Sequence, residues 1–187
     1  MKKILFLGAL SALLFVQCGK SSKNDPFLIT EDAIGNLTYG TRIKQLDSIF
    51  TTDSIVKIQS SPNAIETQGE VEVYEKGGKK LMLLSPKTEM DPNSEVSDIL
   101  FYDSRYHTES GLSKESTFQD FSGKYEIEEI YQTLNNVVVF FKDTNLYLTL
   151  DVKYLLPEVR GNRNAKISAN HIQDDAPIKY LRLDWGK

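Results

Sequence analysis

The chain has 187 residues, of which 40% are hydrophobic, and its 26 acidic residues outnumber its 22 basic ones, for a formal net charge of −4. This length suits one ordinary domain with its own hydrophobic core. The acidic balance argues against nucleic acid as a partner and against broad electrostatic adhesion to anionic lipid, because both carry negative charge.

The first element in the chain is an apolar run from Ile4 to Val16, preceded by Lys2 and Lys3 and followed by Cys18. A basic start before a short apolar run is typical of a secretory signal peptide. The run is shorter than the about 20 residues that a membrane-spanning helix needs. This stretch resembles the signal of bacterial lipoproteins, which is cleaved immediately before a cysteine. The resemblance implies removal of residues 1–17 and lipid attachment at Cys18, as a diacylglyceryl thioether together with an amide-linked fatty acid such as palmitate.

Cys18 is the only cysteine, so no intramolecular disulfide is available and packing alone must hold the fold. Residues 18–26 are small and polar and end in proline, which predicts a flexible tether. Residues 27–187 then form a single globular domain. The lipoprotein resemblance implies a cell-envelope location, with the periplasmic face of the outer membrane favoured because no acidic run follows the cysteine.

Several short β-rich runs in the first half predict a sheet. Apolar residues recur at helical spacing over residues 42–50, and Thr41 is a suitable N-cap, so one short helix is expected there. The pair Gly77-Gly78 lies between two β-rich runs and predicts a hairpin, because a tight two-residue turn needs positive φ. The expected strands are 27–30, 55–58, 71–76, 79–84 and 96–102.

The second half also combines a short helix with β-rich runs, and its strand pattern is clearer. A second short helix is expected over 116–121, followed by a three-strand antiparallel meander of 126–133, 137–142 and 146–152. Residues 137–141 are apolar without alternation, which favours a strand covered on both faces. The irregular stretch 155–177 reads as a long loop, and 178–185 as a closing strand. The predicted fold class is therefore α+β, mainly antiparallel sheet with hairpins and a meander, plus two short helices.

An internal duplication is also suggested by the order of elements. Thr30-Glu31 leads to Gly40-Thr41, a short helix and a strand, and Thr108-Glu109 leads to Ser116-Thr117, a short helix and a strand. Two unrelated capped helices would look the same at this level. The Gly-Thr entry into a short helix resembles segments of small bacterial envelope lipoproteins of unknown function, a resemblance that implies no activity.

Residues that could carry chemistry are sparse. The sequence has no nucleophile elbow, no His-Glu-x-x-His and no phosphate loop. The two histidines, His107 and His171, lie in polar stretches and are expected to be exposed structural residues rather than zinc ligands. An acidic loop with Glu89, Asp91, Asn93 and Glu95 has alternating oxygen ligands but lacks the glycine of a calcium loop. We therefore expect no metal, no cofactor and no catalytic residues.

The one local basic cluster is Arg160, Arg163 and Lys166, which could form a partner-binding loop or a solvated one. The favoured function is a non-catalytic binding or scaffold module, anchored to a membrane by its N-terminal lipid, with an envelope protein or glycan as partner. One alternative is a protein inhibitor of an envelope hydrolase, with residues 157–166 entering the target. A less favoured alternative is a carboxylate-dependent hydrolase of cell-wall or surface glycans.

Overall fold

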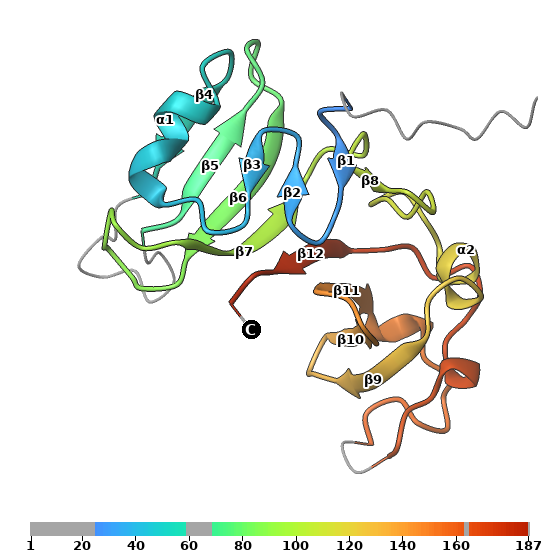
Figure 1. The fold of residues 1–187 in the computed structure, drawn as a ribbon. Helices are drawn as coiled ribbons and strands as arrows, with labels where there is room; N and C mark the ends of the chain where they lie inside the picture. The colour runs from blue at the N-terminus through green and yellow to red at the C-terminus, as the bar shows by residue number, and fades with distance from the viewer. Residues whose placement is uncertain (1–24, 59–68, 163–164, 187) are drawn as a thin grey trace, which may run out of the picture.

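The structure is a computed structural model, and it describes residues 25–58, 69–162 and 165–186. Antiparallel sheet dominates this part of the chain, and the helices are short (Figure 1). The large sheet has eight strands in the order β4-β5-β6-β7-β12-β11-β10-β9, and the small sheet has four in the order β3-β2-β1-β8. The strands are β1 Leu28–Ile29, β2 Ala33–Ile34, β3 Leu37–Thr38, β4 Ser54–Lys57, β5 Val71–Tyr74, β6 Lys80–Pro86, β7 Val96–Phe101, β8 His107–Thr108, β9 Ile127–Gln132, β10 Asn136–Phe141, β11 Leu146–Asp151 and β12 Tyr180–Asp184.

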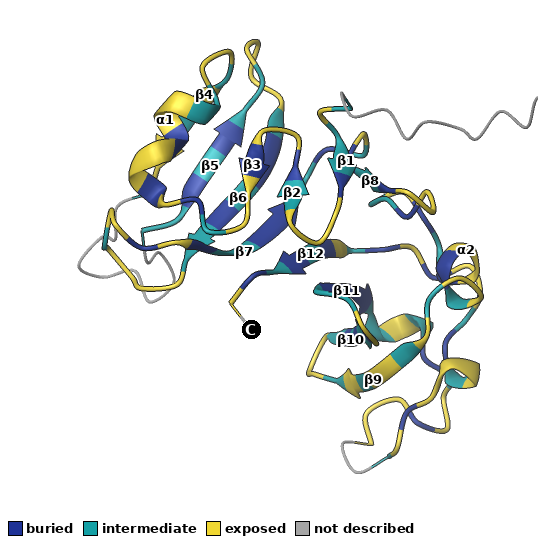
Figure 2. Cartoon of the chain, in the orientation of Figure 1, coloured by how far each residue is buried: buried dark blue, intermediate teal, exposed yellow. Residues whose placement is uncertain are grey.

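The small sheet and the helices pack on one face of the large sheet. The buried cluster joins apolar residues of the large sheet to those of the small sheet and of the helices, as the dark strands of Figure 2 show. In strands such as β5 and β10, alternation sends every second side chain into this cluster. The helices are η1 Ile43–Gln45, α1 Leu46–Ile49, α2 Phe118–Ser122, η2 Val152–Tyr154 and η3 Ala169–His171.

The large sheet consists of two halves with the same plan. In each half a short helix precedes four antiparallel strands, α1 before β4–β7 and α2 before β9–β12. The last strands of the two halves, β7 and β12, pair antiparallel at the centre of the sheet, where Ile99 opposes Leu183 and Phe101 opposes Leu181. Backbone hydrogen bonds make Val96 equivalent to Ile178, and therefore Ile99 to Leu181 and Phe101 to Leu183. Exchanging the two halves turns one pair into the other, so a pseudo-twofold axis passes between the two strands.

The same backbone hydrogen bonds fix the helix entry in each half. The residue that starts the helix donates its N–H to a carbonyl in the segment that leads into the last strand. The N–H two residues after that carbonyl donates to the residue just before the N-cap. The matching bonds are Ile43 N to Ser94 O and Phe118 N to Ala176 O, and Val96 N to Thr41 O and Ile178 N to Ser116 O. The two halves therefore share one backbone plan, and an origin by duplication stays a prediction.

The sequence alignment of the repeat was wrong in detail. The hydrogen bonds match Thr41 with Ser116 rather than with Thr117. In both halves this hydroxyl accepts the N–H of the residue three positions earlier, Thr38 in the first half and Ser113 in the second. The pairing of the preceding hairpins matches Thr108 with Ile34 and not with Thr30. Thr30 belongs to the turn after β1, a strand with no counterpart in the second half of the described chain.

Several other expectations need correction. The helix expected over 42–50 is split into η1 and α1, and its N-cap is Arg42 instead of Thr41. Strand β10 does alternate: one set of side chains enters the core, while Val138 and Phe140 lie half-buried on the other face, so the expected cover on both faces is only partial. The stretch 155–177 is not a free loop, because Leu155 and Ile172 form a β-bridge and are buried.

Candidate functional site

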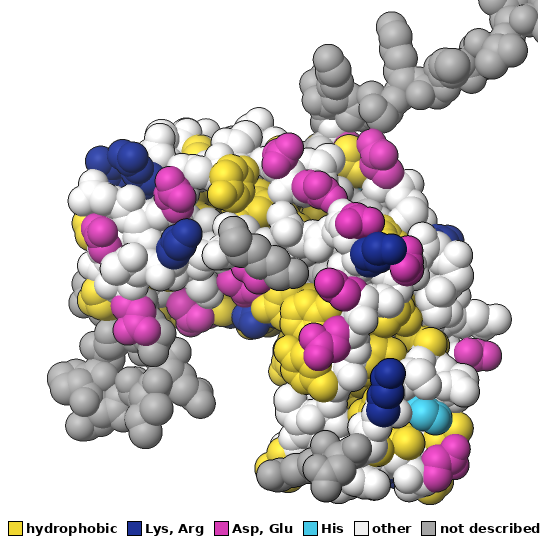
Figure 3. All heavy atoms as spheres, turned by 60° about the horizontal axis from the view of Figure 1, so that its bottom comes forward, with side chains coloured by type: hydrophobic (Ala, Val, Ile, Leu, Met, Phe, Trp, Pro, Cys, Tyr) yellow, Lys and Arg dark blue, Asp and Glu magenta, His cyan; other side chains and the backbone are white. Residues whose placement is uncertain are grey.

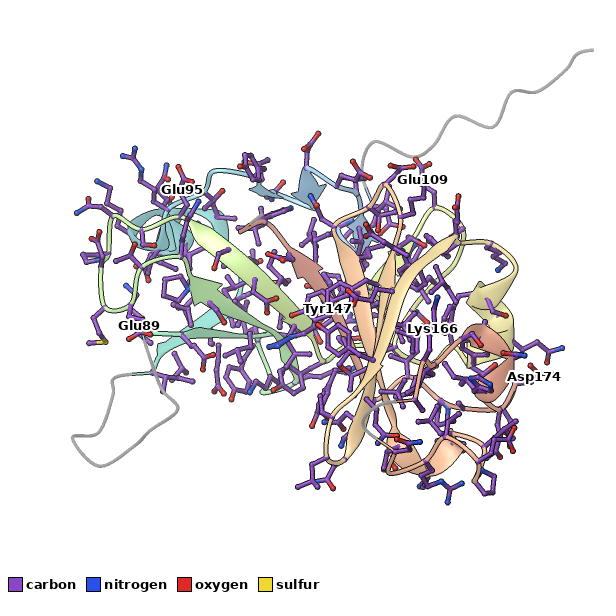
Figure 4. The ribbon with its side chains drawn as sticks, turned by 90° about the horizontal axis from the view of Figure 1, so that it is seen from below. Glu89, Glu95, Glu109, Tyr147, Lys166 and Asp174 are labelled. Atoms are coloured by element: carbon purple, nitrogen blue, oxygen red, sulfur yellow. The ribbon has the colours of Figure 1, made fainter. Side chains whose placement is uncertain are left out.

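The face of the large sheet opposite the small sheet is the candidate site. Figure 4 looks onto the molecule from below and places Tyr147 near its middle. Alternation along the strands places six aromatic rings on this outer face. We call these residues, together with Asp98 and Arg182, the tyrosine face; its rings are Tyr74, Tyr102, Tyr131, Phe140, Tyr147 and Tyr180.

Three of these rings form a row across neighbouring strands. Phe140 and Tyr147 are Cα partners on β10 and β11, and their rings stack at 5.1 Å with an interplanar angle of 6°. Tyr131 on the edge strand β9 extends the row, with its ring centroid 5.5 Å from that of Phe140. Such cross-strand aromatic pairs stabilise a sheet, by roughly 0.2–1 kcal/mol each. The row also leaves Tyr131 42% exposed at the edge of the sheet.

A polar group lies at the centre of the face, beside the pseudo-twofold axis. The Tyr147 hydroxyl donates to Asp98 Oδ2 at 2.7 Å, and Arg182 Nε lies 3.2 Å from Asp98 Oδ1 in an ion pair without a hydrogen bond. Burial raises the pKa of Asp98 above its ordinary value, although the charge of Arg182 and the hydrogen bond from Tyr147 both lower it. Asp184 is the Cα partner of Asp98 across the strands. Chemically, this is a carboxyl group that can hold a proton more readily than usual, next to a second carboxyl-bearing residue.

The first half contributes a more polar cluster to the same face. Lys80 hydrogen-bonds Glu72, and the Tyr74 hydroxyl donates to the same carboxylate. The hydrogen bond from Lys80 is the main reason that the pKa of Glu72 is lowered. The Lys80 ammonium also lies 4.2 Å from the ring centroid of Tyr102. Each charge here has a partner, so this cluster serves to hold side chains in place.

Figure 3 shows hydrophobic side chains gathered beside a hollow in the underside of the molecule, with acidic and basic groups around them. Exposed apolar surface of this kind, ringed by polar groups, is typical of interaction sites. Tyr180 on β12 is 39% exposed, and Leu134, beyond the end of β9, is 76% exposed.

The residues that the sequence singled out lie elsewhere. Cys18 and Arg163 are outside the described residues. The guanidinium of Arg160 donates to the carbonyl oxygens of Lys153 and Leu155, at 2.8 Å and 2.6 Å, so it ties its own loop together. Lys166 is exposed. The structure therefore assigns Arg160 a structural role and leaves the binding role of the basic cluster a prediction.

The histidines and the acidic loop have local partners. His107 Nδ1 contacts the Arg105 carbonyl at 2.8 Å, and His171 Nδ1 accepts from the Ser168 N–H at 3.2 Å. Asp91 accepts the N–H of Asn93, which folds the acidic loop on itself. Among the residues that the structure describes, no group of three His, Cys, Asp or Glu side chains could hold a metal ion. Within the same residues no helix is both long enough and apolar enough to cross a membrane.

Comparison with known proteins identifies no family and no function for this chain. No family model matches the chain, and no curated protein matches it significantly. Among solved structures, the chain is similar to the uncharacterized protein yfeY from Escherichia coli, with a TM-score of 0.49 and 16% identity, over 82% of this chain and 97% of that chain. That protein's function is itself uncharacterized, so the comparison carries no argument about function.

The tyrosine face was missed from the sequence. Tyr131, Tyr147 and Tyr180 lie on strands that the sequence does predict, and each is followed or preceded by an alternating apolar residue. Alternation therefore tells that these tyrosines share the side away from the core. It does not tell that β12 lies between β7 and β11, which brings the two halves of the face together.

Proposed function

We propose that this chain is a lipid-anchored envelope protein that works as a non-catalytic binding module for another envelope protein. The anchor rests on the resemblance of residues 1–18 to lipoprotein signals, with Cys18 as the attachment site. The periplasmic face of the outer membrane is the favoured location. The described residues hold no spanning helix, and in this proposal the lipid is the attachment to the membrane.

The observation that supports the binding role is the tyrosine face. Tyrosine and arginine are enriched where proteins bind proteins, since a large ring with a polar tip buries much area and loses little side-chain entropy. Here five tyrosines and Arg182 share one sheet face. The exposed rings are Tyr131 and Tyr180, while Tyr147 is fixed by Asp98. A fixed central side chain with exposed rings around it is more typical of a face that binds a protein than of a face that only contacts water.

Site-specific photocrosslinking in intact cells tests this proposal. A photoreactive phenylalanine analogue replaces Tyr131 or Tyr180 in the membrane-anchored protein, and Tyr39 serves as the matched control. Tyr39 is 56% exposed and packs against Trp185 on the small-sheet side. We expect the same discrete protein adduct from Tyr131 and Tyr180 and not from Tyr39, and the Tyr131→Ser, Tyr180→Ser double variant should lose the partner in copurification. The same pattern from all three positions, or adducts to glycan alone, would contradict a protein partner.

A second candidate, glycan hydrolysis by carboxylates, is favoured only by the raised pKa of Asp98 beside Asp184. Asp98 is engaged by Tyr147 and Arg182, which suits a structural carboxylate. Release of reducing ends from cell-wall glycan by the wild type, abolished in Asp98→Asn at unchanged stability, would establish this activity in place of a purely binding role. The inhibitor hypothesis for residues 157–166 stays a prediction.

A further inference from the structure

A cleft of about 370 Å³ lies between the small sheet and the second half of the large sheet, away from the tyrosine face. Its apolar lining consists of Ile29 on β1, Leu146 on β11 and Leu183 on β12. All three side chains belong to the buried core, so the cleft reaches down to it. The volume is within the range of about 300–1,000 Å³ that is usual for small-molecule sites.

Three hydroxyl groups meet on one wall of this cleft. Thr108 Oγ1 lies 2.7 Å from the Tyr125 hydroxyl and 3.0 Å from Ser110 Oγ, and the Ser110 and Tyr125 hydroxyls also contact each other. Thr108 Oγ1 in addition accepts the N–H of Leu112. In a closed ring of three hydroxyls each donates once, so the lone pairs that remain on Ser110 and Tyr125 are acceptors for a donor from a ligand.

The first half shows that the fold does not require these hydroxyls. The position of Thr108 corresponds to Ile34 in the first half, and both are Cα partners of Ile29. The position of Tyr125 corresponds to Phe50, because each donates its N–H to the equivalent helix carbonyl. The same backbone plan thus packs with apolar side chains in one half and with hydroxyls in the other.

Ser110 comes from a difference in loop length. Two residues separate Ile34 from Leu37, whereas three separate Thr108 from the equivalent Leu112. The longer loop of the second half brings Ser110 into contact with Tyr125. Three independent differences between the halves, two substitutions and one extra residue, therefore converge on a single hydroxyl cluster.

The charges around the cleft decide which ligands fit. Glu31 and Glu109 line it together with Lys124, whose ammonium donates to the Ser110 carbonyl at 3.1 Å. Two carboxylates against one ammonium disfavour an anionic ligand. Figure 4 shows Glu109 near the upper edge of the molecule, well apart from Tyr147 in that view.

We propose that this hydroxyl cleft binds an uncharged amphiphile, with an apolar body on Ile29, Leu146 and Leu183 and a hydroxylated head that donates to Ser110 and Tyr125. Alkyl glycosides and monoacylglycerols share this chemistry. The inference is independent of the tyrosine face and of its partner protein.

The test is an NMR titration of the chain from residue 19, which contains every described element of the fold. The probes are hexyl glucoside, monohexanoylglycerol, hexanoate and free glucose, and the readout is the methyl shifts of Ile29, Leu146 and Leu183. We expect saturable shifts with one or both uncharged amphiphiles, and the tighter of the two identifies the head group. Hexanoate and glucose should each bind at least about 10-fold more weakly, since one carries the disfavoured charge and the other lacks the apolar body.

Tyr125→Phe is the decisive variant, because it installs the residue type that the first half already uses at this position. It should keep the fold and weaken binding about 5- to 10-fold through loss of one hydrogen bond. Tyr131→Ser, on the tyrosine face, is the matched control and should bind like the wild type. The proposal is overturned if neither uncharged amphiphile saturates, if hexanoate binds equally well, or if Tyr125→Phe binds unchanged.

Discussion

The first half of the chain and the second half use the same helix entry, the same strand order and the same bonds between them, yet they place different side chains at equivalent positions. Phe50 and Ile34 in the first half stand where Tyr125 and Thr108 stand in the second. On the outer face the first half has the ion pair of Glu72 and Lys80, and the second half has the stacked row of rings. Because the same backbone forms with either set of side chains, the fold does not require the residues that differ between the halves. Those residues are therefore the ones that can form a binding site.

The largest expected loss of stability comes from truncating a buried helix residue, and the same change in each half compares the contributions of the two halves. Leu46 in α1 and Phe121 in α2 are equivalent and fully buried. Phe121 contacts both Phe118 and Phe141 edge to face, at 5.3 Å and 5.6 Å between ring centroids. We expect Phe121→Ala to lower the free energy of unfolding by about 4 kcal/mol and Leu46→Ala by about 3 kcal/mol.

Denaturant unfolding measures both values. If the shared sheet joins the halves into one cooperative unit, each variant will show a single transition with an unchanged slope. Two separate transitions, with only one moved by each substitution, would show that the halves unfold independently despite their shared sheet.

The next largest loss of stability is expected from a substitution in the segment that connects the halves. Asp103 follows β7, its carboxylate has no exposed surface, and it pairs with Arg105 at 2.7 Å and Lys79 at 3.1 Å. Burial by itself would raise the pKa of Asp103, but hydrogen bonds from Arg105 and Lys79 outweigh it and hold the pKa far below its ordinary value. Asp103→Asn should therefore lose about 2 kcal/mol at neutral pH, a value that allows for the part-exposed partners.

The pH dependence gives an independent measurement of the same carboxylate. A lowered folded-state pKa stabilises the fold above the unfolded value of about 3.9, and this contribution disappears as pH falls through the range below about 4. The difference in stability between wild type and Asp103→Asn should accordingly shrink on acidification. A difference that stays constant from pH 7 to pH 3 would mean that the charge of Asp103 contributes nothing.

The smallest effect concerns the outer face. Tyr147→Phe removes the hydrogen bond to Asp98 and keeps the ring that stacks on Phe140. We expect a loss of about 1 kcal/mol in thermal or denaturant unfolding. Tyr74→Phe in the first half removes a bond to Glu72, a carboxylate that Lys80 also hydrogen-bonds, and should have a smaller effect. A larger loss of stability for Tyr74→Phe than for Tyr147→Phe would show that the first half contributes the more important hydrogen bond of the tyrosine face.

Sequence reasoning found the elements that local patterns determine. Alternation in residues 146–150 and the Gly77-Gly78 turn predicted β11 and the hairpin of β5 and β6, because strand periodicity and positive φ are visible in single residues. The strands β2, β3 and β8 were missed because each has two residues, which is too short for any period. Strand β1 is equally short and was predicted only because it lies within the β-rich run 27–30.

Long-range pairing could not be predicted in the same way. The contact of β12 with β7 joins residues about 80 positions apart and depends on how the whole second half folds back. The hydroxyl cleft needs Thr108 of β8, Leu183 of β12 and Tyr125 of the segment after α2, which are far apart in the sequence. The lipid attachment predicted at Cys18 is the reverse case: the prediction rests on residues 1–18 alone, and Cys18 lies outside the described residues.

Strand β1 has a mechanical consequence. It is the first described strand, it pairs with β2 of one half and β8 of the other, and Trp185 near the end of the chain donates to the Glu31 carbonyl just after it. A pull applied to the chain ahead of β1, as from a membrane anchor, is therefore shared at once between both halves. The strand that first takes the load is hydrogen-bonded to both halves, so loss of its bonds to one half leaves it attached to the other.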